Sequence, residues 1–120
     1  MNQKHILLQL RNVGPATLAD FELLGIRTIV QLAASTPDGL YSELQRKTAR
    51  RHDPCVWDTF AAAVHEARTG EALNWWKFTR ERKERQAQGT FPRYIERQEA
   101  LRAALMRVRS TRQSRVNAEA

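Results

Sequence analysis

Apolar residues recur along the first 70 or so positions at the three- and four-residue spacings of amphipathic helices. One stripe consists of Leu18, Phe21 and Leu24. A second stripe consists of Trp57, Phe60, Ala61 and Val64. No alternating run of β-branched residues, which would indicate a strand, is present. The pattern predicts an all-α fold in which five short helices pack as one compact unit.

The polar positions between these stripes indicate where the helices begin and end. Thr28 followed by Gln31 is a capping box. Thr36-Pro37 and Asp53-Pro54 are typical helix starts, because a hydroxyl or carboxylate caps the first turn and proline suits it. Gly25 follows the first stripe and is expected to end that helix in a left-handed conformation.

The connection between the first two helices, residues 10–19, reads Leu-Arg-Asn-Val-Gly-Pro-Ala-Thr-Leu-Ala. Gly14 lacks a Cβ and Pro15 is preset for the first turn of a helix, so a tight left-handed hairpin is predicted. Asn12 is the non-glycine residue type that best tolerates such a turn. The arrangement resembles the helix-hairpin-helix motif of DNA-binding and DNA-repair proteins, whose hairpin usually reads Gly-hydrophobic-Gly.

Two interpretations of this hairpin follow from the resemblance. In the first, backbone N–H groups of residues 13–17 and the Thr17 hydroxyl bind a phosphate at the start of a helix. In the second, the hairpin only fixes the packing angle of two helices, since Ala16 stands where DNA-binding versions commonly carry a cation and Pro15 removes one N–H. The first interpretation assigns nucleic-acid contacts to Arg11, Asn12, Val13, Gly14, Ala16 and Thr17.

The likeness to known proteins extends over residues 5–78. Its motifs are the hairpin, Leu23–Thr28 with Leu32, Leu40–Leu44, Asp53–Val56 and Trp75–Lys77. This order is similar to a bacterial family named for a pathogenicity locus, some members of which carry the label mitomycin-resistance protein. More distantly, it resembles the helical C-terminal domain of a natural-competence regulator. The resemblance implies a five-helix helix-hairpin-helix (SAM-like) domain with a DNA-related role.

Charge divides the chain into two parts. The net charge is +7, and residues 71–120 carry 12 basic and 6 acidic side chains against 8 and 7 in residues 1–70. Such an excess favours a polyanionic partner. We expect a domain over residues 1–78, a charged linker over 79–91, a basic amphipathic helix over 92–112, and a disordered tail over 113–120.

Further basic residues are candidates for phosphate contacts. The end of the fourth predicted helix carries a basic cluster that consists of Lys47, Arg50, Arg51 and His52. They either stabilise the helix dipole or present a second loop to a nucleic-acid backbone. In the predicted C-terminal helix, Arg93 and Arg97 are the candidate contacts. That helix is also expected to dock on the domain, on a protein partner or on a second copy.

Aromatic residues and the single cysteine each allow two interpretations. Trp75 and Trp76, next to Lys77, either cover the open end of the helical unit or stack on nucleobases, and covering is favoured. Cys55 is expected to be a buried thiol. The alternative is a nucleophile at a helix start with His52 as its base.

Taken together, the residues predict a small non-enzymatic protein that contacts nucleic-acid backbone without strong sequence preference. DNA, duplex or branched, is the expected partner, and no cofactor or metal is expected. No apolar stretch approaches the roughly 18 residues of a membrane span, so a cytoplasmic location without membrane contact is expected. The alternative function is a protein–protein adaptor on a degenerate helix-hairpin-helix scaffold.

Overall fold

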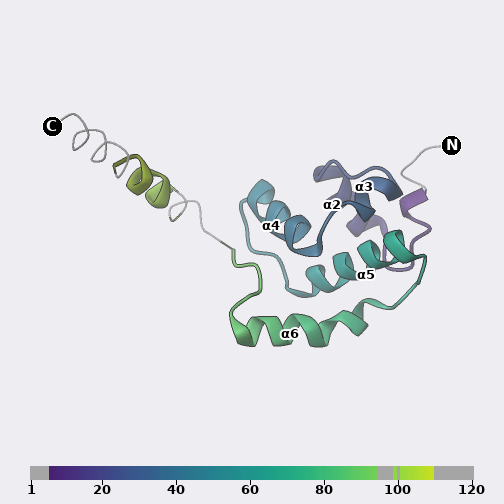
Figure 1. Cartoon of the computed structure of the whole chain (residues 1–120). Helices are drawn as coiled ribbons and strands as arrows, with labels where there is room; N and C mark the ends of the chain where they lie inside the picture. The colour runs from purple at the N-terminus through teal and green to yellow at the C-terminus, as the bar shows by residue number, and fades with distance from the viewer. Residues whose placement is uncertain (1–5, 95–98, 100, 110–120) are drawn as a thin grey trace.

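The computed structural model describes residues 6–94, 99 and 101–109. Within them the chain is all-α, as the periodicity predicts, and contains no strand. Ile6 and Leu7 are helical, and turns over residues 8–12 lead toward the helices labelled in Figure 1. These are α2 (Pro15–Leu23), α3 (Ile29–Ala33), α4 (Pro37–Thr48), α5 (Cys55–Thr69), the 3₁₀ helix η1 (Trp75–Phe78) and α6 (Thr79–Gln88).

Three of the predicted helix ends form as the capping residues require. Thr28 and Gln31 make both hydrogen bonds of a capping box at the start of α3. The hydroxyl of Thr36 accepts the N–H three residues further on, at 3.0 Å, and begins α4. Gly25 has φ 77°, and the N–H that follows it donates to the Phe21 carbonyl at 2.8 Å. This is the Schellman arrangement, which explains why α2 stops before Gly25.

Helix α5 lies at the centre of the bundle, where it contacts α3, α4, α6 and η1 (Figure 1). Its inward residues Trp57, Phe60 and Val64 are at most 2% exposed. The Phe60 ring packs on Phe21 of α2 with ring centroids 5.4 Å apart. The same core includes Leu7, Leu10, Val13, Leu32, Leu40, Tyr41 and Leu44. The two stripes recognised in the sequence are therefore two sides of one core.

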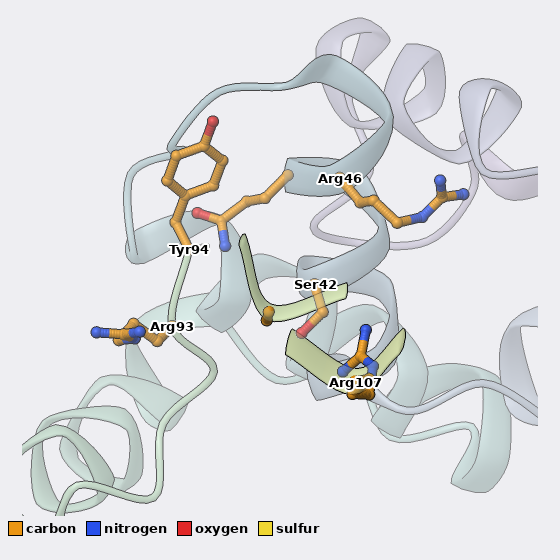
Figure 2. Close-up of a pocket in the computed structure, with 7 residues that line it drawn as sticks. Ser42, Arg46, Arg93, Tyr94 and Arg107 are labelled. Carbon is orange, nitrogen blue, oxygen red and sulfur yellow. The ribbon is translucent and has the colours of Figure 1, made fainter. Parts of the chain in front are cut away.

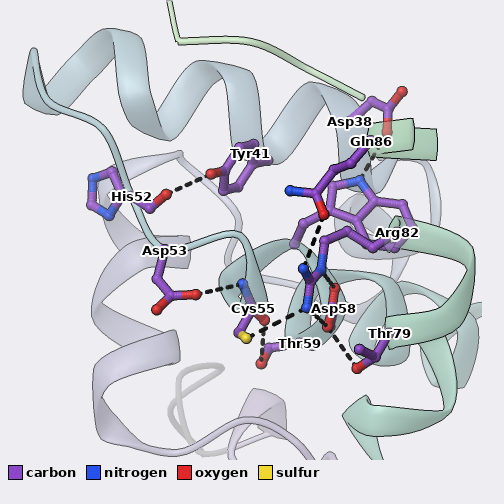
Figure 3. Close-up of polar contacts among 11 residues, drawn as sticks. Asp38, Tyr41, His52, Asp53, Cys55, Asp58, Thr59, Thr79, Arg82 and Gln86 are labelled. Carbon is purple, nitrogen blue, oxygen red and sulfur yellow. Dashed lines mark hydrogen bonds and ion pairs between the residues drawn. The ribbon is translucent and has the colours of Figure 1, made fainter. Parts of the chain in front are cut away.

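The expectation of a linker over residues 79–91 is wrong, because Thr79–Gln88 form helix α6. Arg82 turns inward and donates to Asp58 of α5 at 2.9 and 3.1 Å (Figure 3). Asp58 is fully buried and also accepts a hydrogen bond from the Thr79 hydroxyl at 2.8 Å. A helix held by a buried ion pair needs no apolar stripe, so hydrophobic periodicity gave no sign of it.

A second ion pair fastens the end of α6 to α4. Arg85 donates to both carboxylate oxygens of Asp38, at 2.6 and 2.7 Å. The indole N–H of Trp57 donates to the same carboxylate at 2.8 Å. After α6, the ring of Phe91 packs against Tyr41 and Trp57, with centroids 5.4 and 5.9 Å away. The chain therefore stays attached to the bundle through residue 91.

The tryptophans of η1 do not cover the bundle, contrary to the favoured expectation. Trp75 is 37% exposed and Trp76 is 55% exposed. Phe78 takes the inward position instead, packing against the core and against His65 at 5.8 Å between ring centroids. Successive residues of so short a 3₁₀ turn point in different directions, so one aromatic residue facing inward sends its neighbours outward.

The C-terminal segment differs from the expected continuous helix over 92–112. Residues 92–94 are not helical, whereas residues 101–109 are. Leu101, Leu105, Met106 and Val108 are 50–63% exposed in this helix. Arg97, the end of the expected helix and the expected tail lie outside the described residues.

Candidate functional site

The start of α2 presents three backbone donors. Gly14 is the N-cap residue, and no side chain caps this end of the helix. The first helical hydrogen bond runs from Leu18 N–H to the Gly14 carbonyl, at 2.9 Å. The N–H groups of Gly14, Ala16 and Thr17 precede that bond and have no acceptor within the described part of the chain. An uncapped helix N-terminus of this kind is a favourable environment for an anion.

The hairpin itself is not left-handed. Gly14 has φ −98° and ψ −174°, an extended conformation, and a Cβ at this position would meet no atom within 4 Å. Among the described non-glycine residues, only Ala49 has a positive φ. The predicted left-handed turn at Gly14 is therefore wrong. The chain reverses instead through the turns at residues 8–12, closed by the Val13 N–H on the Leu10 carbonyl at 3.2 Å.

Two of the residues that were predicted to contact nucleic acid stabilise the fold instead. Asn12 donates to the Leu73 carbonyl at 2.6 Å and accepts from the Trp75 N–H at 2.9 Å, so its amide joins the loop to η1. Val13 is 5% exposed and belongs to the core. Arg11 is exposed, with one guanidinium nitrogen 3.2 Å from the side-chain oxygen of Asn74.

The basic cluster at the end of α4 is divided between two roles. Lys47 donates to the Leu23 carbonyl at 3.1 Å and so stabilises the C-terminus of α2 rather than that of its own helix. Arg50 and Arg51 are exposed beyond the end of α4. Partial burial and the charge of Arg50 lower the pKa of His52, which favours its neutral form.

Arginines from three segments of the chain line one cavity of about 390 Å³ beside α4. Arg46 comes from α4, Arg93 follows α6, and Arg107 belongs to the C-terminal helix (Figure 2). The remaining lining residues are Ser42, Gln45, Tyr94 and Ala103. The Arg51 guanidinium lies 5.9 Å from the Tyr94 ring centroid, so the cavity adjoins the exposed end of α4. Arg93 and Arg51 are among the contacts predicted from the sequence, and Arg107 lies in the predicted basic helix. Arg46 and Tyr94 were not predicted as contacts, although Ser42 and Arg46 share the i, i+4 spacing of one helix face.

The loop and the basic cluster lie at opposite ends of α2. Gly14 precedes the helix, whereas Lys47 binds the carbonyl of its last residue, Leu23. A helix of nine residues is about 13 Å long, which corresponds to roughly four base-pair steps of duplex DNA. The structure therefore places the two predicted sites, the loop and the basic cluster, at the two ends of one helix.

Cys55 is exposed, so the expectation of a buried thiol is wrong. Its backbone N–H donates to the Asp53 carboxylate at 2.8 Å (Figure 3). Partial desolvation and the neighbouring Asp53 raise the pKa of the thiol, which is the opposite of what an activated nucleophile requires. The His52 ring bonds instead to the Thr48 hydroxyl, 2.8 Å away.

The family model described as pathogenicity locus matches residues 2–84. The chain belongs to the pathogenicity locus family. The matched region extends past Trp76 into α6 and includes both Asp58 and Arg82. The ion pair that fastens α6 is therefore inside the family region, whereas Arg93 and Arg107 are outside it.

One relative of this chain is named for mitomycin resistance. The mitomycin resistance protein McrB of Streptomyces lavendulae is 40% identical over 77 residues, which cover 64% of this chain and 73% of the relative. No solved structure gives a significant match to the chain. Among the residues that the structure describes, no helix is long and apolar enough to cross a membrane.

Proposed function

We propose that this protein binds the phosphate backbone of nucleic acid without base specificity, and that it is not an enzyme. The observation that carries the proposal is the gathering of guanidinium groups beside α4, where Arg46 and Arg93 line one cavity next to Arg51. Like charges brought together repel one another unless counter-ions bind, and a polyanion supplies those counter-ions.

Two of these arginines form ion pairs with exposed carboxylates, which a phosphate can replace. Glu43 pairs with Arg46, and Glu99 pairs with Arg93 at 3.4 Å. Each of these side chains is at least 40% exposed, and exposed ion pairs contribute at most about 1 kcal/mol. A phosphate can therefore replace either carboxylate at little cost.

The loop before α2 supports the proposal from the other end of that helix. The N–H groups of Gly14, Ala16 and Thr17 are available as donors, and Arg11 lies beside them in the chain. Contacts of these types recognise phosphates and carry no base information. Binding across both ends of α2 would therefore be independent of sequence.

Anisotropy of a fluorescein-labelled 20-base-pair duplex, titrated with the full-length protein at 50 and 200 mM salt, tests the proposal. We expect Arg50→Gln/Arg51→Gln to weaken binding several-fold, equally on two unrelated duplex sequences. The control, Arg27→Gln, removes one positive charge from an exposed position just before α3 and should have a smaller effect. Absence of binding by the parent protein at 50 mM salt would reject the proposal.

The adaptor function remains the second candidate because of one observation. Leu101, Leu105 and Val108 recur at four- and three-residue spacing and are 50–60% exposed, so they present an apolar face. Such faces commonly pair with another helix. If Leu101→Ser/Leu105→Ser abolishes co-purification of a partner protein while the parent binds no duplex, the adaptor function replaces nucleic-acid binding.

A further inference from the structure

The surface around η1 combines two exposed indole rings with a rigid backbone. Trp75 and Trp76 meet edge to face, with ring centroids 5.7 Å apart and planes at 82°. The Asn12 amide holds the Trp75 N–H, and the Asn74 carbonyl accepts the Lys77 N–H at 3.0 Å. The Asn74 side chain in turn accepts from Arg11. The rings are therefore presented on a fixed turn, and ordering them costs little entropy when a ligand binds.

Cations flank the indole pair on the following residues. Lys77 belongs to η1 itself, and Arg80 and Lys83 line a shallow hollow along α6. Arg80 pairs with Glu84 at 3.2 Å, but its side chain is 90% exposed, so this pair is easily exchanged for a phosphate. On the other side of η1, the two hydrogen bonds of Asn12 join the turn directly to the loop that precedes α2.

We propose that Trp75 and Trp76 form a stacking site for unpaired nucleobases, so that this protein binds single-stranded nucleic acid through η1. The inference rests on the proposed function, because the cations and the loop before α2 are taken to hold the backbone on either side. Aromatic rings stack on any base, and alternation of rings with cations is the usual composition of single-strand binding surfaces.

The geometry favours a single strand over a duplex. Neighbouring bases of a duplex are parallel and covered by one another, whereas the two indole planes are nearly perpendicular. Bases that stack on both rings must turn independently, which only a flexible unpaired strand permits. The ring pair therefore distinguishes nucleic-acid structure rather than base sequence.

A folded protein fits this surface less well. Two tryptophans exposed to 37% and 55% offer roughly 200 Å² of apolar area. A standard protein–protein interface needs about 800 Å² from each partner. The exposed indole area is therefore well below what such an interface needs.

The test compares fluorescein-labelled dT20 with the 20-base-pair duplex at 50 mM salt, using the full-length chain. We expect Trp76→Ala to bind dT20 about 5- to 150-fold more weakly, and the duplex within about twofold of the parent. Trp76→Phe keeps an aromatic face and should retain most of the dT20 affinity. Val30→Ala removes an apolar side chain that is 77% exposed on α3 and should change neither affinity.

A second readout does not depend on the alanine variant folding. Stacking should quench the tryptophan emission of the parent when dT20 binds, and the quenching should shrink in Trp76→Phe. A parallel titration with rU20 shows whether the strand is preferred as DNA or as RNA.

Two results would overturn the inference. If dT20 binds the parent without quenching, or binds Trp76→Ala as tightly as the parent, the indoles are not a stacking site and the proposed backbone binding stands. If neither dT20 nor the duplex binds the parent, the proposed function and this inference fail together.

Discussion

Polar side chains hold the connections of this molecule in place. The amide of Gln45, 2% exposed, accepts the backbone N–H of His52 at 3.0 Å. The hydroxyl of Tyr41, equally buried, donates to the carbonyl of the same residue at 2.6 Å. A buried polar backbone group left without a partner costs about 1–3 kcal/mol. These side chains therefore fix the path of the loop between α4 and α5.

Two glycines on either side of α2 should respond differently to the same substitution. Gly25 has φ 77°, so Gly25→Ala should lower the free energy of unfolding by about 1–2 kcal/mol. Gly14 is extended with open space at its Cβ position, so Gly14→Ala should change that free energy by less than about 1 kcal/mol. Urea denaturation of both variants measures this, and equal losses would show that the loop before α2 is strained.

The stability of the protein should fall more when one partner of the buried pair of Asp58 and Arg82 is removed than when both are removed. Arg82→Met leaves a fully buried carboxylate without its counter-charge, which should cost about 3–5 kcal/mol of unfolding free energy. Asp58→Leu/Arg82→Met leaves no orphaned charge and should lose less. Denaturation of the single and double variants provides the measurement. A single variant as stable as the parent would mean that α6 is not held by this pair.

At the scale of elements, α6 is joined to the bundle chiefly by charge. Its sequence, Thr-Arg-Glu-Arg-Lys-Glu-Arg-Gln-Ala-Gln, has no apolar stripe. Arg82 reaches α5 and Arg85 reaches α4, one helical turn apart. This attachment extends the folded unit beyond Phe78, where the sequence placed its end. A chain cut at that point would lose the arginine partners of both Asp58 and Asp38.

The pair between Asp38 and Arg85 makes the docking of α6 sensitive to acid. Hydrogen bonds from Arg85 hold the pKa of Asp38 below its usual value. A lowered pKa means that the contribution to stability is complete above about pH 4 and is lost as the pH falls through the pKa of the folded state. We expect Arg85→Met to raise the pKa of Asp38 and to flatten the loss of stability below pH 4.

Carboxyl NMR titration and acid denaturation check this expectation. The matched control is Arg80→Met, which breaks an exposed pair on the same helix and should leave the pKa of Asp38 unchanged. An unchanged acid profile in Arg85→Met would show that other carboxylates dominate the loss of stability at low pH.

At the scale of the whole molecule, the positive charge is not spread evenly over the surface. Cations of α6 such as Arg82 and Arg85 are used inside the fold, although they contribute to the excess counted in the sequence. Arg50, Arg51 and Arg93 remain exposed on the α4 side. Net charge therefore overstates what is available to a polyanion, and the position of each arginine decides its use.

Salt dependence should report how many of these arginines contact phosphate. The logarithm of the duplex association constant should fall with the logarithm of salt concentration by about 0.9 for each phosphate neutralised. We expect Arg50→Gln/Arg51→Gln/Arg93→Gln to reduce that slope by up to about 0.9 for each contact removed. Anisotropy titrations from 50 to 200 mM salt measure it. A weaker affinity with an unchanged slope would mean that the substitutions act through the fold.

The helical class, the positions of α2 to α5 and the family resemblance could all be predicted from the amino-acid sequence. These features depend on local chemistry: a capping hydroxyl at Thr28 or Thr36, a left-handed glycine at Gly25, and apolar residues repeating along one helix face. Each is complete within one or two helical turns, so it can be recognised without knowledge of the rest of the chain.

Which residues are available to a ligand depends on tertiary contacts, which the sequence does not reveal. The side chain of Asn12 hydrogen-bonds to a residue more than 60 positions further along the chain. Arg82 is buried against an aspartate 24 positions before it. Trp76 is left in water because a neighbouring aromatic residue faces the core. Pairings between distant segments leave no periodic trace in the sequence, since a single hydrogen bond or ion pair needs only one residue from each side.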